Sequence, residues 1–522
     1  MTQWRWSRRA LLRGGLQAAG GTLLGAPAAV IAQSMRIQAP CGAQVGDIAG
    51  DRAVLWSRAD RPSRMSVELS TTGSFARSTV LTGPFALEDS EFTARLDIGG
   101  LPPGQRISYR VRFLDLQDFA SESEPVTGSF ATPPAGRRDV RFLWSADTVG
   151  QGWGINPDTG GMTIYETMRR RQPDFFIHSG DTIYADNPVE AEKPVPGGGI
   201  WRNLTLEGKH KVAETLTEFR ACHRYNLLDE HLRRFNGEVA MFAQWDDHEV
   251  VDNWYWQRRL DGDPRYREKS VALLAARSAR AFFDYMPVRR QPDAPERLYA
   301  SFRWGPSLEV FRLDMRSHRG RNTDGLETAL GPDARILGAA QLHWLKQALL
   351  ASDATWKVIA ADMPLGLVVW DDYRTRSGSE AVAQGDPGEP RGRELEIAEL
   401  LTFIARNRIA NTVWLTADVH YTAAHYYDPA KARYGDFAPF WEFVSGPLNA
   451  GTFGPNDLDP TFGPEVVFTK APPPGQFNLP PSAGLQFFGQ VDIDGDSEAM
   501  TVSLCDMKGE VLFAKVLEPI LG

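Results

Sequence analysis

Six short apolar segments of this chain each end in an aspartate. The segments are VRFLWSAD, DFFIHSGD, VAMFAQWDD, LEVFRLD, WKVIAAD and NTVWLTAD, and their final acids are Asp147, Asp181, Asp246 with Asp247, Asp314, Asp362 and Asp418. Helical stretches such as TIYETMRRRQ at 163–172 separate them, and strands that alternate with helices predict an α/β architecture. Ligands of open α/β sheets bind at the carboxyl ends of the strands. We therefore expect these acids to meet at one edge.

Each of these acids has an ordinary explanation when it is taken alone. Aspartate is frequent in turns and at the N-termini of helices, where its side chain accepts backbone N–H groups. Several carboxylates at one sheet edge, however, repel one another strongly unless cations neutralise them. We therefore expect most of the strand-end aspartates to build a metal site.

Residues 33–135 follow a different pattern, in which short segments of alternating polarity are separated by turn residues. MSVELST, FTARLDIG and ISYRVRFLD are examples. This pattern predicts an antiparallel β-sandwich, and LPPGQRISY at 101–109 resembles the tyrosine corner of fibronectin-type sandwiches. A Pro- and Gly-rich linker follows at 132–136. We therefore expect a fibronectin-like all-β sandwich at 33–135 and an α/β core at 139–522.

The first 32 residues have the layout of an export signal. Four arginines lie within residues 5–13, and small and apolar residues follow them. Arg8 and Arg9 resemble the pair of a twin-arginine signal. A short membrane anchor and a disordered basic tail are the alternatives, although the apolar run is shorter than the ~20 residues of a spanning helix. We expect the twin-arginine translocation machinery to export the chain, and cleavage of residues 1–32 to leave it periplasmic or secreted.

Charge and cysteine content restrict the partners of the chain. It has 57 basic and 66 acidic residues, a formal net charge of −9, and no basic stripe, so we do not expect a nucleic-acid partner. Three cysteines cannot build a disulfide framework. A hydrophobic content of 42% is that of a globular protein with a sizeable core, and we expect a monomer.

Three motifs carry a resemblance to a known family. They are GDTIY at 180–184, WDDHE at 245–249 and ADVH at 417–420. In this order they resemble the motifs of calcineurin-like metallophosphoesterases, and more narrowly those of PhoD-type alkaline phosphatases, which are related to purple acid phosphatases. The predicted export signal, the sandwich and RLDMRSHR at 312–319 fit the same family. The resemblance implies a metallophosphatase core with an αββα arrangement, which the C-terminal strands close.

The resemblance also implies two adjoining metal sites that share one carboxylate. The ligands of the first site would be Asp147, Asp181, Tyr184 and His420. The ligands of the second site would be Asp181, Asp247, Asp362 and Asp418. Asp147 stands where PhoD proteins often have a cysteine. Oxygen-only ligand sets favour Ca²⁺, Mg²⁺ or Mn²⁺, whereas Zn²⁺ usually recruits His or Cys. The family implies Fe³⁺ in the first site and Ca²⁺ in the second.

The implied activity is the hydrolysis of phosphate monoesters and diesters by a hydroxide that bridges the two metals. His248 would donate a proton to the leaving group of a small phosphate ester, and Arg316 or Arg319 would hold the non-bridging oxygens. One alternative is a phosphodiesterase or phospholipase-type hydrolase on the same fold. Another is a non-catalytic, metal-stabilised binding protein. His248 and the arginines argue against the latter, because metal binding alone does not require them.

Overall fold

The computed structural model describes residues 36–521. The predicted export signal at 1–32 lies outside the described residues. Within the described part of the chain, no helix combines the length and the apolar character needed to cross a membrane.

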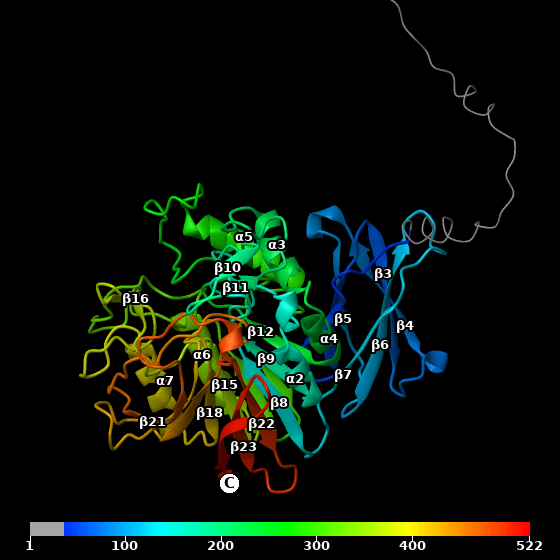
Figure 1. Cartoon of the computed structure of the whole chain (residues 1–522). Coiled ribbons are helices and arrows are strands. Elements are labelled where there is room, and N and C mark those ends of the chain that lie inside the picture. Colours follow the sequence, from blue (N-terminus) through cyan, green and yellow to red (C-terminus); the bar gives the residue numbers. More distant parts are fainter. Residues whose placement is uncertain (1–35, 522) are drawn as a thin grey trace, which may run out of the picture.

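The N-terminal region is a β-sandwich, drawn in blue at one side of the molecule (Figure 1). One sheet has the strand order β4-β3-β6-β7, and the other face is made by β1, β2 and β5. Side chains of β3 alternate between buried and half-buried, which is the burial pattern of a strand with one face in a core. The bounds are β1 Ala43–Ala49, β2 Arg52–Arg58, β3 Ser63–Ser70, β4 Thr79–Ala86, β5 Thr93–Ile98, β6 Arg106–Asp115 and β7 Val126–Ala131.

The sandwich and the core share one sheet, a connection that the strand pattern did not indicate. Strand β1 pairs with the core strand β12 in parallel, with Gly46 opposite Met241. A Cβ atom on Gly46 would lie 2.6 Å from the carbonyl oxygen of Met241, so only glycine permits this approach. A buried ion pair reinforces the junction, because Nη1 of Arg312 lies 2.7 Å from Oδ1 of Asp47.

The shared sheet has nine strands in the order β24-β23-β22-β8-β9-β12-β1-β2-β5. Strands β8, β9 and β12 run parallel to one another, whereas the C-terminal strands join by antiparallel pairing. The bounds of the core strands are β8 Val140–Ser145, β9 Phe175–Ser179, β12 Ala240–Gln244, β22 Phe487–Ile493, β23 Met500–Asp506 and β24 Val511–Leu517.

A second sheet packs against the first. It has seven strands in the order β13-β14-β15-β18-β20-β19-β21. Aromatic rings fill the space between the two sheets, and the centroids of Phe242 and Phe302 lie 4.2 Å apart. The bounds are β13 Ala300–Trp304, β14 Leu308–Arg312, β15 Trp356–Ala360, β18 Thr412–Thr416, β19 Thr422–Tyr427, β20 Phe440–Val444 and β21 Pro464–Lys470.

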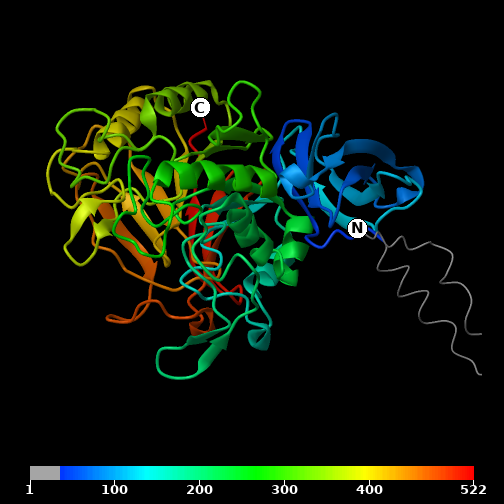
Figure 2. The same cartoon turned by 90° about the horizontal axis from the view of Figure 1, so that it is seen from above.

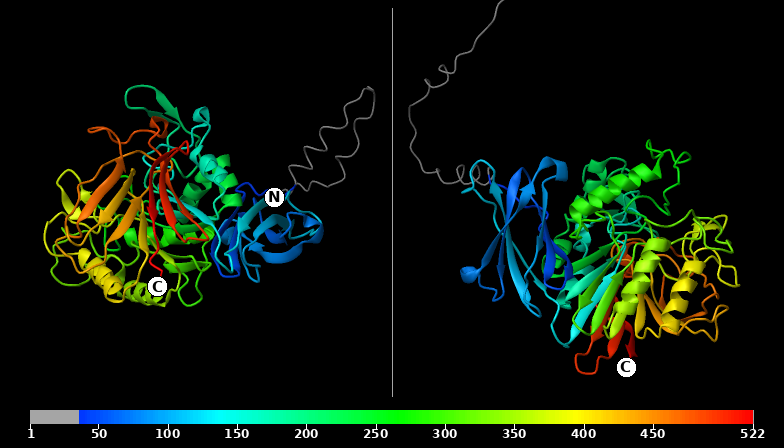
Figure 3. Two further views of the ribbon diagram at one scale, coloured as in Figure 1. Left: turned by 90° about the horizontal axis from the view of Figure 1, so that it is seen from below. Right: turned by 180° about the vertical axis from the view of Figure 1, so that it is seen from behind.

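Helices cover the outer faces of both sheets, as Figures 2 and 3 show. Four of them pack on the first sheet, namely α2 Ile164–Arg170, α3 Leu216–Asn226, α4 Glu230–Glu238 and α5 Val271–Tyr285. Two pack on the second sheet, namely α6 Gly338–Ala351 and α7 Glu394–Arg406. The four layers confirm the predicted αββα core behind a β-sandwich.

Short elements complete the chain between these layers. Two hairpins project from the core, and the second of them, β16–β17, borders the pocket described below. The hairpin strands are β10 Glu192–Pro194, β11 Ile200–Arg202, β16 Trp370–Asp372 and β17 Ser377–Ser379, and the 3-10 helices are η1 Phe75–Arg77, η2 Glu88–Ser90, η3 Pro157–Thr159 and η4 Pro481–Ala483.

Candidate metal centre

The strand-end carboxylates meet where the two sheets present the carboxyl ends of their parallel strands. Strands β8, β9 and β12 deliver acids from the first sheet, and β15 and β18 deliver acids from the second. The backbones of Asp147, Asp181, Asp418 and His420 have φ values between 51° and 67°. Residues other than glycine rarely adopt this left-handed conformation, and such strain concentrates at functional sites. The chain therefore turns sharply at four of the predicted ligands.

The four residues predicted for the first metal site lie together. Asp147, Asp181 and His420 offer ligand atoms that all lie within 4.8 Å of one another. The hydroxyl of Tyr184 donates to Oδ1 of Asp147 at 3.4 Å and lies 2.8 Å from Nε2 of His420. All four side chains are buried. Two carboxylates, a phenol and an imidazole can therefore point at one cation.

The second predicted site assembles with one difference. Asp181 and Asp247 form one group of close ligand atoms with His248, and Asp247 and Asp418 form another with Asp246. Asp181 belongs both to this region and to the first site, so its carboxylate lies between the two. Asp246 was not among the predicted ligands. Its signal was its place at the same strand end as Asp247.

Asp362 lies behind this group rather than within it. It is fully buried, and one of its oxygens lies 3.7 Å from Nε of Arg316. The groups of ligand atoms that lie within 4.8 Å of one another include Asp246 but not Asp362 among the described residues. Asp246 is therefore a further candidate for the fourth carboxylate, beside Asp362, whose two oxygens have no hydrogen-bond partner within the described chain.

The chemistry of this cluster fits bound cations. Burial, with repulsion from neighbouring carboxylates, raises the pKa values of Asp147, Asp181 and Asp418 well above the usual range. Several buried oxygens have no hydrogen-bond partner within the described chain, among them Oδ2 of Asp147 and Oδ1 of Asp247. Buried carboxylates are stable when they are paired or coordinate a metal. The donor set consists mainly of oxygens, which hard cations prefer.

His248 lies beside this cluster in a fixed orientation. Its Nδ1 is 2.8 Å from Oδ1 of Asp186, and its ring stacks on Tyr184 with centroids 4.2 Å apart. A carboxylate can only accept, so Nδ1–H donates and Nε2 faces Asp247 and Asp252, at 4.0 and 3.8 Å from their Oδ1 atoms. Burial would lower the pKa of His248, but Asp186, Asp247 and Asp181 together raise it well above its usual value.

Two carboxylates that sequence reasoning did not select support the centre. One is Asp186, which holds His248. The other is Glu249, which accepts the backbone N–H groups of Asp181 at 3.1 Å, Thr182 at 2.5 Å and Asp246 at 2.7 Å. Glu249 therefore ties the loop after β9 to the loop after β12. Glu249 belongs to the WDDHE motif and Asp186 follows the GDTIY motif by two residues, but only the folded chain shows what they contact.

The predicted arginines lie behind the carboxylates. Nε of Arg316 donates to Oδ1 of Asp246 at 2.5 Å, and Arg316 and Arg319 both pair with Glu380. Both guanidinium groups are buried. The lining of the open pocket, as far as the structure describes it, includes Arg265 and Arg376 but neither of these two. This placement differs from the predicted contact with a substrate, because internal carboxylates already occupy both side chains.

An open pocket of about 940 Å³ leads to the centre. Asp247, His248, Asp418 and His420 form its floor. Its walls come from residues near Asp186 on one side and from the β16–β17 hairpin on the other. The remaining wall residues are Gln151, Asn187, Asp252, Asn253, Arg265, Val368, Val369, Trp370, Asp371, Tyr373, Arg376, Val419, Phe453, Gly454, Pro455, Asn456, Asp457 and Phe477.

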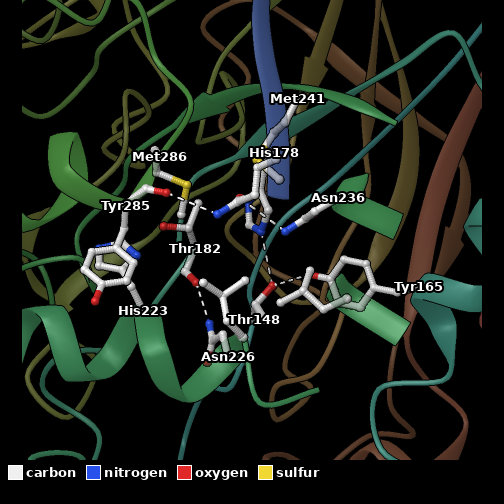
Figure 4. Close-up of a pocket in the computed structure, with 13 residues that line it drawn as sticks. Thr148, Tyr165, His178, Thr182, His223, Asn226, Asn236, Met241, Tyr285 and Met286 are labelled. Atoms are coloured by element: carbon white, nitrogen blue, oxygen red, sulfur yellow. Dashed lines mark hydrogen bonds between the residues drawn. The ribbon is translucent and has the colours of Figure 1, made fainter. Parts of the chain in front are cut away.

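A separate small cavity of about 30 Å³ lies inside the core near β9 (Figure 4). Thr148 Oγ1 lies 3.1 Å from Nε2 of His178 and 2.8 Å from the hydroxyl of Tyr165. Burial lowers the pKa values of His178 and His223 to about 3, so both imidazoles are neutral. The cavity contains no carboxylate in its described lining, which distinguishes it from the metal centre.

Comparisons with known proteins agree with this geometry. The family model described as "PhoD-like phosphatase" matches residues 142–504, and "PhoD-like phosphatase, N-terminal domain" matches residues 25–134. The chain is 27% identical over 403 residues to "Alkaline phosphatase D" of Bacillus subtilis (strain 168), which is 73% of this chain. The chain spans 64% of the length of that curated relative.

Two solved structures share the fold. One is titled "Structure of PhoD", with a TM-score of 0.64, 19% identity and coverage of 92% of this chain and 88% of the other. The other is a purple acid phosphatase isolated from yellow lupin (Lupinus luteus) seeds, with a TM-score of 0.54, 11% identity and coverage of 91% and 74%. At these identities the likeness concerns the fold.

Proposed function

Because this chain belongs to the PhoD-like phosphatase family, we propose that it is a metal-dependent phosphatase that hydrolyses phosphate monoesters and diesters. The observation that supports this proposal best is the floor of the open pocket, where buried carboxylates and two histidines gather. A binding protein would not require an oriented, proton-bearing histidine beside a metal cluster.

The proposed cation sites follow from the donor atoms. Asp147, Asp181, Tyr184 and His420 would hold one cation, and their phenol and carboxylates suit Fe³⁺. Asp181, Asp247 and Asp418, with Asp246 beside them, would hold a second, for which Ca²⁺, Mg²⁺ or Mn²⁺ are suited. When bound, two such cations clamp a phosphoryl group and lower the pKa of a water molecule.

His248 supplies the proton for the leaving group in this proposal. Asp186 is among the carboxylates that raise its pKa, which favours the protonated imidazole. Nδ1–H is committed to Asp186, which leaves Nε2–H directed toward the pocket. A positioned acid of this kind lowers the barrier for departure of an alkoxide. The chain thereby provides the group that an alcohol leaving group needs.

Arg316 and Arg319 take a positioning role in this proposal. Arg316 orients Asp246 through its Nε contact, and Glu380 holds both arginines from behind. Direct contact between either arginine and a non-bridging oxygen remains a prediction. It would require Arg316 to reach past Asp246.

Turnover of a chromogenic monoester and the matching diester tests the function. We expect both to be hydrolysed with bound metals, because the pocket of about 940 Å³ is larger than a phosphoryl group. Asp181→Asn should abolish both activities while leaving the circular dichroism spectrum unchanged. Full activity in that variant would contradict the assignment. Hydrolysis of the diester alone would favour the phosphodiesterase alternative.

Export and assembly belong to the same proposal. We place the mature enzyme in the periplasm or outside the cell, after export by the twin-arginine machinery, as a monomer that acts on small phosphate esters. The support is the arginine pair in SRRALL at 7–12. Replacement of Arg8 and Arg9 by lysine should retain the enzyme inside the cell, and light scattering on the exported protein reports its mass.

A further inference from the structure

The open pocket is larger than a phosphoryl group requires. Its volume of about 940 Å³ lies near the top of the ~300–1,000 Å³ range of small-molecule sites. The carboxylates and the histidines occupy only its floor. We propose that its outer part is a subsite for the alcohol portion of the ester, and that it selects alcohols carrying a planar unsaturated ring. This inference rests on the proposed function.

Aromatic side chains carry the argument. Trp370, Tyr373, Phe453 and Phe477 all line the pocket. Tyr373 is 59% exposed and Phe477 is 68% exposed. Single exposed aromatic residues are ordinary on protein surfaces, but these two come from separate loops and face one pocket above a metal centre. Aromatic faces favour stacked or edge-to-face contact with another ring, so a ring-bearing ligand would cover them.

The structure holds these rings in place. Nδ2 of Asn456 donates to the hydroxyl of Tyr373 at 3.1 Å and to the carbonyl oxygen of Val368 at 3.0 Å. These bonds tie the β16–β17 hairpin to the loop that carries Phe453. A pre-arranged aromatic wall costs little ordering entropy when a ligand binds. The fixed ring of Tyr373 is therefore suited to stack against a ligand.

The aromatic wall is continuous with the floor of the pocket. The ring of Phe453 contacts that of His420 with centroids 5.3 Å apart. An antiparallel bridge between Thr452 and Leu479 joins the Phe453 loop to the segment that carries Phe477. A phosphate held above His420 would thus direct its alcohol along Phe453 toward the rim.

The charged residues of the outer pocket do not favour a ligand of either charge. Side chains of both signs line the same region, namely Arg265, Arg376, Asp252, Asp371 and Asp457. An alcohol with a strong charge of either sign would meet a like charge there. Aromatic faces line the side of the outer pocket built by the β16–β17 hairpin and by the segments that carry Phe453 and Phe477, and a neutral planar base fits them.

Two phosphate esters, one with and one without a nucleobase, test the subsite. Thymidine 5′-monophosphate and 2-deoxyribose 5-phosphate carry phosphate on the same primary alcohol, but only the first has a base. With the metal-loaded full chain, we expect kcat/KM to be about tenfold higher for the nucleotide, because stacking of one base contributes on that order. Tyr373→Ala and Phe477→Ala should each remove most of this preference and leave the sugar phosphate within about twofold.

Matched variants separate stacking from other effects. Tyr373→Phe keeps the ring but removes the hydroxyl that accepts from Asn456, and it should retain most of the preference. Phe119→Ala removes an aromatic side chain that is 57% exposed in the sandwich and should change neither substrate. Equal kcat/KM for the two substrates in the native chain would overturn the proposal. So would an equal loss for both substrates in the alanine variants.

Failure of the proposed function leaves a distinct result. If neither ester is hydrolysed, the phosphatase assignment fails, and calorimetric titration with the same two compounds then decides the subsite. Tighter binding of the nucleotide, weakened about tenfold by Phe477→Ala, would support a ring subsite. Equal affinity for the nucleotide and the sugar phosphate would overturn it.

Discussion

Oδ1 of Asp186 lies 2.8 Å from Nδ1 of His248, and Oδ2 of the same carboxylate accepts the backbone N–H of Asp252 at 3.0 Å. Asp186 therefore fixes both the tautomer and the angle of the imidazole. Asp186→Asn should reduce kcat by about 100-fold and leave KM nearly unchanged, because correct proton transfer contributes about 10²–10⁴-fold. Steady-state kinetics on a phosphate ester with a poor leaving group measures both constants.

The pH profile distinguishes this role from a structural one. Asp186 is among the groups that raise the pKa of His248, so the alkaline limb of kcat should move to lower pH in Asp186→Asn. Asp261→Asn is the matched control, since Asp261 is exposed and pairs with the exposed Arg259. An unchanged alkaline limb in Asp186→Asn would argue that another group donates the proton.

Removal of metal should make the chain sensitive to alkaline pH. Burial and neighbouring acids raise the pKa of Asp418 in the folded state, so the metal-free folded chain binds more protons than the unfolded chain above pH ~4. Its free energy of unfolding therefore decreases as pH rises. After chelation we expect a melting temperature at pH 8 at least about 2 °C below that at pH 6.

Replacement of Asp418 by asparagine should change the melting temperature in opposite directions in the metal-free and the metal-loaded chain. Asp418→Asn removes a buried charge, so it should raise the melting temperature of the chelated chain at pH 8. The same change removes a ligand and should lower the melting temperature of the metal-loaded chain. Differential scanning fluorimetry with and without chelator measures both. A decrease of equal size in both states would show that Asp418 is a structural residue and not a ligand.

The strand-end acids were accessible from the sequence because β-strands that alternate with helices run parallel and share an edge. That ground selects Asp147, Asp181 and Asp418, but it selects Asp314 as well, which belongs to none of the groups of close ligand atoms among the described residues. The place of Asp246 beside Asp247 and Asp418 could not be predicted in this way, since it depends on distances between side chains that only the folded chain sets.

Contacts between distant segments were equally inaccessible. The pairing of β1 with β12 depends on one glycine that lets two strands approach, and no periodicity signals it. Glu380 lies in a segment without an apolar pattern, and it reaches Arg316 from the position directly after β17. The family resemblance located the motifs but not these supports.

Glu380 should be important for stability as well as for the metal centre. It is the carboxylate partner of both Arg316 and Arg319, and all three side chains are buried. Glu380→Gln removes the carboxylate that pairs with the buried Arg319 and leaves Arg316 paired with Asp246, and removal of one partner of a buried pair costs about 3–5 kcal/mol. Chemical denaturation should show a loss of this size, together with weaker metal binding as Arg316 shifts toward Asp246.

An exposed pair provides the comparison for Glu380. Asp372 pairs with Arg374 at 3.3 Å on the surface of the same hairpin, where ion pairs contribute little. Asp372→Asn should leave the unfolding transition and the metal affinity unchanged. Equal effects of Glu380→Gln and Asp372→Asn would show that the buried network does not position the centre.

The two neutral histidines of the core should limit stability in acid. Burial lowers the pKa values of His178 and His223 to about 3, whereas an unfolded histidine has a pKa of ~6.5. Unfolding therefore takes up one proton for each residue between pH 6.5 and pH 3. The free energy of unfolding should fall as pH decreases through this window, by about 1.4 kcal/mol per pH unit for each histidine.

His223→Phe removes one of these protons and keeps a ring that can stack on Tyr285, as His223 does with ring centroids 5.4 Å apart. Denaturation at pH 7, 6 and 5 should therefore show a shallower pH dependence in His223→Phe than in the native chain. His343→Gln, at an exposed position, should retain the native slope, and a native slope in His223→Phe would mean that His223 is protonated in the folded state.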